Sequence, residues 1–238
     1  MGEGQRSLSL SLLGVYETLA ISVPTVFDSI RGTLTDDASN RRLEAWSNNI
    51  VKHAGISLTV SGRQHLVGGH HVVMSNHQSH YDIPLLFAVL GSRMRMVTKA
   101  ELFRIPIFGR ALLASGFVSI DRSRRDRAVA SLSDARSLLD AGMSVWIAPE
   151  GTRSPTGAML PFKKGGFHLA QETGTDILPV AIDGTHKILS RNGVRSLQNV
   201  AVNVTIMPPI SPREFPQTSE GRSNLMTAVR DSIQRGLR

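Results

Sequence analysis

The stretch that decides the fold covers residues 71–86 and reads HVVMSNHQSHYDIPLL. Its first five residues are mostly apolar and partly β-branched, which predicts a short buried strand. Asp82 and Pro84 then open a second apolar run, as expected for the N-cap and first turn of a helix. His77 and Asp82 therefore flank a turn that leads from a strand into a helix.

The His77 and Asp82 side chains have the chemistry of a general base and the carboxylate that orients it. Such a turn can fold the carboxylate back onto the imidazole, which keeps one ring nitrogen protonated and leaves the other free to accept a proton. The pair contains no nucleophile of its own, so a substrate would have to supply one. A structural role is the alternative, with Asp82 as a helix cap and His77 as a hydrogen-bonded loop residue.

Potential metal ligands crowd into the same part of the chain. They are His70, His71, His77, His80 and Asp82. Zinc hydrolase signatures place their ligands at fixed offsets on one face, and the spacing here matches none of them. The chain also contains no cysteine, so disulfides and thiol catalysis are excluded. We therefore expect no metal site.

The composition indicates a globular protein with an anionic partner. The chain has 238 residues, enough for one large α/β domain or two small ones. Lysine and arginine number 27 against 19 acidic residues, a net charge of +8. Most of the basic residues are arginine, the better bidentate ligand for phosphate. Aromatic residues are few and do not alternate with basic ones, so a nucleic acid is not the expected partner.

The N-terminal region carries an apolar helix pattern. Between residues 7 and 27 only Glu17 is charged, and that length can cross a bilayer. On a helical wheel, one side is an apolar stripe that consists of Leu8, Leu12, Val15, Tyr16, Leu19, Val23, Val26 and Ile30. Glu17 and Asp28 lie on the opposite side. The apolar residues Leu10, Leu13 and Ile21 fall on the side of Glu17, so the stripe is not clean. We interpret this as a helix lying in a membrane interface; a helix that covers the protein's own core is the alternative. Pro24 is expected to kink or end it.

Strand and helix patterns alternate after residue 55. A second helix over about 40–53 completes an N-terminal helix pair in residues 1–54, and Gly55 is a plausible stop. Strands are predicted at 56–61, 71–75, 94–98, 117–121, 145–148, 177–182 and 200–207. Helices are predicted at 83–90, 106–114, 126–140, 166–172 and about 220–237. Residues 55–238 should therefore form an α/β domain with a mostly parallel mixed sheet of about seven strands and helices on both faces.

Polar motifs follow several predicted strands, where open α/β sheets bind ligands. The predicted strand motif at residues 116–122 ends at Arg122. Residues 149–153 read PEGTR, and the side chains of Thr152 and Arg153 are hydrogen-bond donors suited to a phosphate. Residues 160–166 add Lys163 just before a helix N-terminus, which favours anions. Each motif alone could be a salt-bridged turn on a basic surface. Because all of them follow predicted strands, a shared ligand-binding site is favoured.

The chain resembles the glycerolipid acyltransferases, specifically the 1-acylglycerol-3-phosphate acyltransferases. The matching blocks are NHQSHYD at 76–82, GFVSIDR at 116–122, PEGTRS at 149–154, LPVAI at 178–182 and KAELF at 99–103. Their order and spacing make the resemblance specific over about residues 55–210. Ser119 and Ala148 depart from the bulky apolar residues that are usual at those points.

The resemblance implies transfer of a fatty acyl group from acyl-CoA or acyl carrier protein to the free sn-2 hydroxyl of a lysophospholipid, 1-acylglycerol 3-phosphate. His77 would be the base and Asp82 its orienting partner, with no cofactor besides the thioester co-substrate. Lys99 is a candidate oxyanion donor. The residues that would bind the acceptor's glycerol phosphate are Glu150, Gly151, Thr152 and Arg153, helped by Arg122 and Lys163.

Other activities stay open at this point. Another lysophospholipid or glycerol 3-phosphate could be the acceptor, and the same fold could serve a non-catalytic lipid-binding protein. Ser75 and Ser79 lack the Gly-x-Ser-x-Gly elbow of serine hydrolases, and the chain lacks a P-loop. Because the substrates are amphiphiles, we expect a peripheral or interface-embedded protein on the cytoplasmic face of a membrane with anionic lipids. The N-terminal helix pair resembles the family's membrane-seating element, and nearby arginines would contact the headgroups.

Overall fold

The computed structural model describes residues 6–66, 69–120 and 125–237, without the side chains of 125–130. The strands in these ranges form one seven-stranded sheet in the order β1-β7-β6-β2-β5-β3-β4. They are β1 Ser57–Ser61, β2 Val72–Ser75, β3 Met94–Lys99, β4 Val118–Ile120, β5 Ser144–Ile147, β6 Ile177–Asp183 and β7 Ala201–Ile206. Every neighbouring pair is parallel except β6 and β7, so the predicted mixed, mostly parallel sheet is confirmed.

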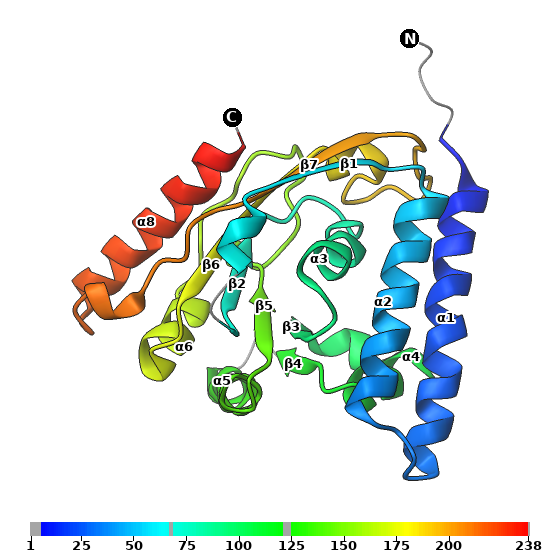
Figure 1. Cartoon of the computed structure of the whole chain (residues 1–238), viewed down its shortest axis with the longest axis horizontal. Helices are drawn as coiled ribbons and strands as arrows, with labels where there is room; N and C mark the ends of the chain where they lie inside the picture. Colours follow the sequence, from blue (N-terminus) through cyan, green and yellow to red (C-terminus); the bar gives the residue numbers. More distant parts are fainter. Residues whose placement is uncertain (1–5, 67–68, 121–124, 238) are drawn as a thin grey trace.

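Helices cover both faces of this sheet (Figure 1). The α-helices are α1 Leu8–Ile30, α2 Asp36–His53, α3 Asp82–Leu90, α4 Phe108–Ala114, α5 Arg125–Asp140, α6 Gly165–Thr173, α7 Thr185–Ile188 and α8 Ser219–Gly236. Short 3-10 turns lie at η1 Arg63–Leu66, η2 Ala100–Arg104 and η3 Pro212–Glu214. The α5, α6 and α8 helices enclose one apolar cluster with the sheet, and α1 to α4 enclose the other.

Burial explains why some strands are uniformly apolar and others alternate. The central strands β2 and β6 are covered by helices on both faces, and all their residues except Asp183 are buried. The strands β1 and β7 lie at one side of the sheet, and their exposed and less exposed residues alternate. The prediction that apolar runs form buried strands is therefore confirmed for the strands that helices cover on both faces.

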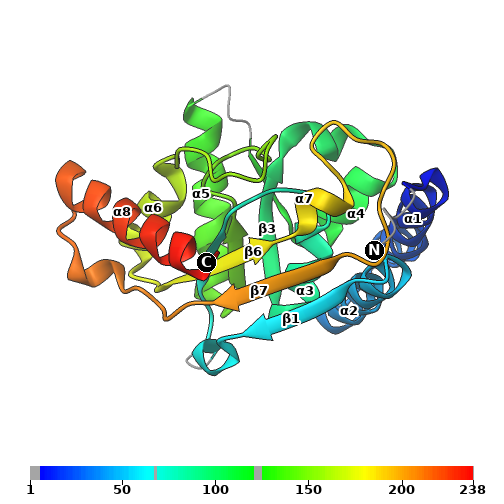
Figure 2. The same cartoon turned by 90° about the horizontal axis from the view of Figure 1, so that it is seen from above.

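The α1 helix turns its apolar side away from the protein. Tyr16 is 65% exposed and Ile30 is 74% exposed, whereas Glu17, Ser22 and Thr25 are buried. The buried side packs on α2, which runs beside α1 at one end of the molecule (Figures 1 and 2). The predicted stripe therefore does not cover the protein's own core.

Polar contacts with α2 fix this orientation. The Trp46 indole donates to Thr18 Oγ1 at 3.1 Å, and the Asn49 amide donates to Glu17 Oε2 at 3.0 Å. The Arg42 guanidinium bonds Asp28, beyond Pro24 in the chain. Contacts with α2 on both sides of the proline hold the helix, so it does not end at Pro24.

Candidate active site

The five strands β2 to β6 are parallel and point their carboxyl ends to one edge of the sheet, and the predicted motifs follow them there. His77 and Asp82 follow β2, Glu150 to Arg153 follow β5, and Lys99 ends β3. A short helix, α7, follows β6 and lies over the same edge (Figure 2). Arg122 follows β4 but lies outside the described residues.

Asp82 is the centre of this edge. It opens α3 and is 0% exposed. Its Oδ2 atom accepts from the backbone N–H groups of Gln78 and Ser79 at 2.7 and 2.9 Å. Its Oδ1 atom accepts from the Thr185 hydroxyl of α7. A carboxylate with this many donors has a fixed position.

The His77 imidazole is oriented by that carboxylate. His77 Nδ1 lies 2.7 Å from Asp82 Oδ2. Because an ionised carboxylate can only accept, we assign the proton to Nδ1, which leaves the Nε2 lone pair available as a base. The ring is 14% exposed and stands edge-on to Trp146, with 5.4 Å between centroids. The predicted geometry of an oriented base is thus present.

Glu150 joins two of the predicted motifs. Its side chain is buried, and its two oxygens accept from the backbone N–H groups of His77 at 2.8 Å and Leu160 at 2.7 Å. Burial raises the pKa of Glu150, while these two hydrogen bonds act against the rise. In the described residues the carboxylate thus holds the backbone beside the base; a direct contact with the acceptor stays a prediction.

Arg153 lies next to this junction. Gly151 has a φ of 72°, which lets the chain turn sharply after β5. The Ser154 N–H donates to the His77 carbonyl at 2.7 Å, which fixes the following loop against the base. Arg153 is half-buried; burial lowers its pKa, the nearby Arg191 lowers it further, and Asp82 acts in the opposite direction. The neighbouring Thr152 is exposed.

The two lysines among the predicted residues lie at the surface. Lys99 Nζ is 3.2 Å from Glu101 Oε1, and both side chains are exposed. Lys163 is exposed, and its backbone N–H donates to the Pro149 carbonyl at 2.7 Å. Neither lysine has a described contact with His77, so their roles stay predictions.

Several residues of the site were missed at the level of sequence. Thr185 and Gln78 bond Asp82, and Gln78 also donates from its side chain to the Gly157 carbonyl at 2.9 Å. The Asn76 amide donates to the Ile182 carbonyl and accepts from its N–H, both at 2.8 Å, which joins the end of β2 to β6. Asn76 and Gln78 lie inside the motif of residues 76–82, so the sequence could have indicated them. Thr185 lies in no recognised motif, so the sequence could not.

His80, in the same block, also has an altered environment. The residue is exposed as a whole, but desolvation of its ring lowers its pKa to about 4. The charges of Arg153 and His77 act in the same direction, and Asp82 opposes them. His80 is therefore neutral beside the base at neutral pH.

The serine-hydrolase alternative has no support in this geometry. The Ser79 hydroxyl donates to the Leu189 carbonyl at 2.8 Å, and Ser75 Oγ accepts from the Trp146 indole at 2.9 Å. No hydrogen bond links either hydroxyl to the His77 ring in the described part of the chain. Nor do the described residues contain a group of three side chains placed to hold a metal ion.

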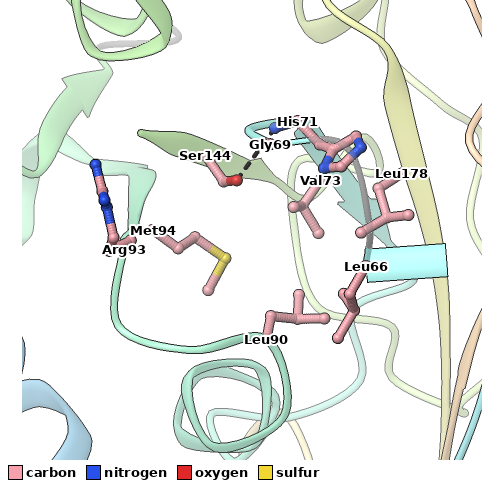
Figure 3. A pocket seen from close by; sticks show the side chains of 9 residues that line it. All are labelled: Leu66, Gly69, His71, Val73, Leu90, Arg93, Met94, Ser144 and Leu178. Atoms are coloured by element: carbon pink, nitrogen blue, oxygen red, sulfur yellow. Dashed lines mark hydrogen bonds between the residues drawn. The ribbon is translucent and has the colours of Figure 1, made fainter. Parts of the chain in front are cut away.

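A cavity of about 70 Å³ lies at the opposite edge of the sheet (Figure 3). It is lined by Leu66, Gly69, His71, Val73, Leu90, Arg93, Met94, Ser144 and Leu178. These residues surround the amino ends of β2, β3 and β5, so the cavity is separate from His77. Its volume suits about two water molecules rather than a lipid.

The fold and the site define an α/β protein with a histidine that a buried carboxylate orients, at the carboxyl ends of its central strands. Comparison with known proteins identifies its family. A family model described as "Acyltransferase" matches residues 57–183. The crystal structure of the 1-acyl-sn-glycerophosphate (LPA) acyltransferase PlsC from Thermotoga maritima superposes with a TM-score of 0.80, at 27% identity, and covers 97% of this chain and 94% of that one.

Relatives of known sequence give the same result. The 1-acyl-sn-glycerol-3-phosphate acyltransferase alpha of Mus musculus is 34% identical over 191 residues, 77% of this chain and 67% of the relative. The 1-acyl-sn-glycerol-3-phosphate acyltransferase of Saccharomyces cerevisiae is 33% identical over 183 residues, 75% of this chain and 59% of the relative. The chain thus spans about two thirds or less of these relatives. It belongs to the acyltransferase family that includes the 1-acyl-sn-glycerol-3-phosphate acyltransferases.

Proposed function

We propose that this protein transfers a fatty acyl group from an acyl thioester to the free sn-2 hydroxyl of 1-acylglycerol 3-phosphate and so makes phosphatidic acid. The observation that carries the proposal is the 2.7 Å contact of His77 Nδ1 with the buried Asp82, at an edge that also holds Arg153. The relatives named for this reaction support the choice of acceptor. Acyl-CoA or acyl carrier protein would be the co-substrate, and the reaction needs no other cofactor.

The reaction follows from the free Nε2 atom of His77. Nε2 takes the proton of the acceptor hydroxyl as its oxygen attacks the thioester carbonyl carbon. The tetrahedral intermediate collapses, the C–S bond breaks, and the imidazolium returns its proton to the departing thiolate. Asp82 stabilises the imidazolium between these two steps. Since the substrate hydroxyl is the nucleophile, no acyl-enzyme forms.

Arg153 is the first candidate for binding the acceptor's phosphate. A guanidinium binds phosphate through two parallel hydrogen bonds, and Thr152 beside it offers a hydroxyl donor. Lys99 and backbone N–H groups of the first block are candidates for stabilising the oxyanion. A non-catalytic lipid-binding protein would not require the buried carboxylate that orients His77.

The α1 helix supports a location at a membrane surface. Among the described residues, α1 is the helix whose length and composition would allow it to cross a bilayer. Because its polar side is engaged by α2, only one side is left for lipid, as for a helix lying in the interface. We propose a peripheral or interface-embedded protein on the cytoplasmic face. A tag at the N-terminus that proteases reach only from the far side of sealed vesicles would instead mean a spanning helix.

The decisive experiment is an acceptor panel with two donors. Purified protein is given acyl-CoA or acyl carrier protein thioester with 1-acylglycerol 3-phosphate, glycerol 3-phosphate or lysophosphatidylcholine. Thiol release and the acylated product are both measured. We expect thiol release that depends on 1-acylglycerol 3-phosphate and yields phosphatidic acid. Preference for another acceptor, or thiol release without acylated lipid, would refute the proposal.

A further inference from the structure

Two arginines, Arg153 and Arg191, follow strands or helices at the edge of the sheet that holds His77. Arg153 follows β5, and Arg191 lies three residues after α7. Within the described ranges, neither guanidinium makes a hydrogen bond or an ion pair with another residue. By contrast, the buried Arg95 donates to the Ser92, Met94 and Ser115 carbonyls and to the Asn40 side chain. As far as the structure describes the chain, Arg153 and Arg191 are therefore not used as structural donors.

The loops that carry these arginines are fixed to the same short turn. The Ser154 N–H donates to the His77 carbonyl at 2.7 Å, one residue from Arg153. The Ser79 hydroxyl donates to the Leu189 carbonyl at 2.8 Å, two residues from Arg191. Residues 77–79 thus anchor both loops beside the His77 side chain.

The second loop has further supports beyond Arg191. The Leu197 N–H donates to the Ile188 carbonyl at 2.8 Å, which closes residues 188–197 into a compact loop. Ser196 in this loop is buried and accepts from the Tyr81 hydroxyl at 3.2 Å. Because Tyr81 precedes Asp82 directly, this loop is held to the catalytic turn at two points.

The two guanidinium groups are close enough to repel each other. After burial, the charge of Arg191 is the next largest influence that lowers the pKa of Arg153. Like charges near each other destabilise the ionised forms, and an anion placed between them relieves that repulsion. Arg191 itself is exposed, so a ligand can reach it.

We infer that Arg191 is a specificity-determining residue that, together with Arg153, binds the phosphomonoester of the acceptor. This inference rests on the proposed function and names which headgroup that site selects. A phosphomonoester carries nearly two negative charges at neutral pH and three terminal oxygens, enough for two guanidinium forks. A phosphodiester headgroup has one charge and two such oxygens, so it leaves part of one fork unpaired. The pair therefore selects lysophosphatidic acid over lysolipids with a substituted phosphate.

The test replaces Arg191 and a matched neighbour. Arg191→Gln is compared with Arg195→Gln, since Arg195 is exposed in the same loop and the charge change is equal. The acceptor is a short-chain, soluble 1-acylglycerol 3-phosphate at fixed acyl-CoA. We expect the acceptor KM of Arg191→Gln to rise about tenfold, the fold-change for one lost charged hydrogen-bond contact, with a smaller change in kcat. Arg195→Gln should match the wild type, and Arg191→Lys should recover part of the loss.

A binding measurement makes the test independent of turnover. Calorimetric titration of wild type and both variants with sn-glycerol 3-phosphate should show weaker binding for Arg191→Gln alone. The acceptor KM of the wild type should also fall between about pH 5 and pH 7.5, as the phosphomonoester gains its second charge. This fall should be smaller in Arg191→Gln.

The other outcomes overturn the inference in separate ways. Equal acceptor KM values and equal binding for the two glutamine variants would refute it and leave the proposed function intact. A raised KM for acyl-CoA alone would assign Arg191 to the donor's phosphates. Weaker binding to anionic liposomes with an unchanged KM for the soluble acceptor would assign it to the membrane. A wild type that acylates only diester lysolipids would refute the proposed function and the inference together.

Discussion

The two ends of β2 each carry a histidine, and only one of them is built into a site. His71 precedes the strand and His77 follows it. The His77 ring is bonded to a buried carboxylate that backbone and side-chain donors hold in place. The His71 ring lines the small cavity of Figure 3, and no hydrogen bond joins it to another described residue.

The electrostatic surroundings of the two rings differ in the same way. Burial lowers the pKa of His71; the charge of Asp176 opposes that shift, and His70 adds to it. Among the residues that the structure describes, no carboxylate is bonded to this ring, in contrast to His77. Parallel strands bring loops together beyond their carboxyl ends, and those loops supply the orienting groups. The amino ends receive the returning chain and are packed mainly for stability.

Replacement of the two histidines should give the largest contrast. We expect His77→Ala to lose about 10²–10⁴-fold or more in kcat, the usual contribution of a general base, while its circular dichroism spectrum and Tm stay close to wild type. His71→Gln is the matched control and should keep kcat within about twofold, because its ring contacts no reacting group. Normal turnover of a folded His77→Ala protein would refute the assignment of the base.

Loss of the arginine beside the base should be the next largest effect. Arg153→Ala should raise the acceptor KM roughly ten- to a hundredfold, since a charged hydrogen bond to phosphate contributes about 1.5–3 kcal/mol. The KM for acyl-CoA should change much less. Steady-state kinetics with each substrate varied in turn measure both values, and a raised donor KM with an unchanged acceptor KM would reverse the assigned roles.

Removal of the Thr185 hydroxyl, which α7 supplies, should have a moderate effect on kcat or stability. Thr185→Val removes the donor to Asp82 Oδ1 and keeps the shape of the side chain. One lost hydrogen bond to a charged group is worth about 1.5–3 kcal/mol, so either kcat or the free energy of unfolding should fall by a corresponding amount. Thr185→Ser restores the hydroxyl and should behave like the wild type. If Thr185→Val and Thr185→Ser are equally active and equally stable, the hydroxyl does not support the site.

The smallest expected effect is a pH dependence of stability from His80. Its pKa is about 4 in the folded protein, below the ordinary value of about 6.5. Between these values the unfolded chain binds more protons than the folded one, so the contribution of His80 to stability is lost as the pH falls through this window. Tm measured at about pH 4.5 and 7.5 should differ less for His80→Gln than for the wild type. If the Tm difference between the two pH values is the same in both proteins, the lowered pKa of His80 is contradicted.

The strand pattern and the pairing of His77 with Asp82 could be read from local sequence. The seven predicted strands match the observed ones within a few residues, because each is a short run rich in apolar or β-branched residues and bounded by turn residues. The His77 and Asp82 side chains meet because five positions span a single turn between β2 and α3. The α7 helix escaped prediction, since four residues give no periodic pattern.

Other parts of the site depend on contacts between distant residues. Thr185 is 103 positions from Asp82, and Glu150 is 73 positions from His77. These contacts exist because β5 and β6 both pair with β2, and no local pattern specifies the order of strands in a sheet. The contacts of Thr185 with Asp82 and of Glu150 with the His77 backbone therefore could not be predicted from local sequence.

The sequence by itself determined the strands, most of the helices, the His77–Asp82 pair and the apolar stripe of α1, because each depends on spacing along a few turns of chain. The tertiary structure decided which way that stripe faces: α2 offers polar partners to Glu17 and Thr18, so the apolar side is left outside. It also decided that the loops of Arg153 and Arg191 are held to the same turn, because Ser154 and Leu189 bond residues 77 and 79. The periodicity of the sequence defines which residues share one face of a helix, and only the packing of distant elements defines what that face contacts.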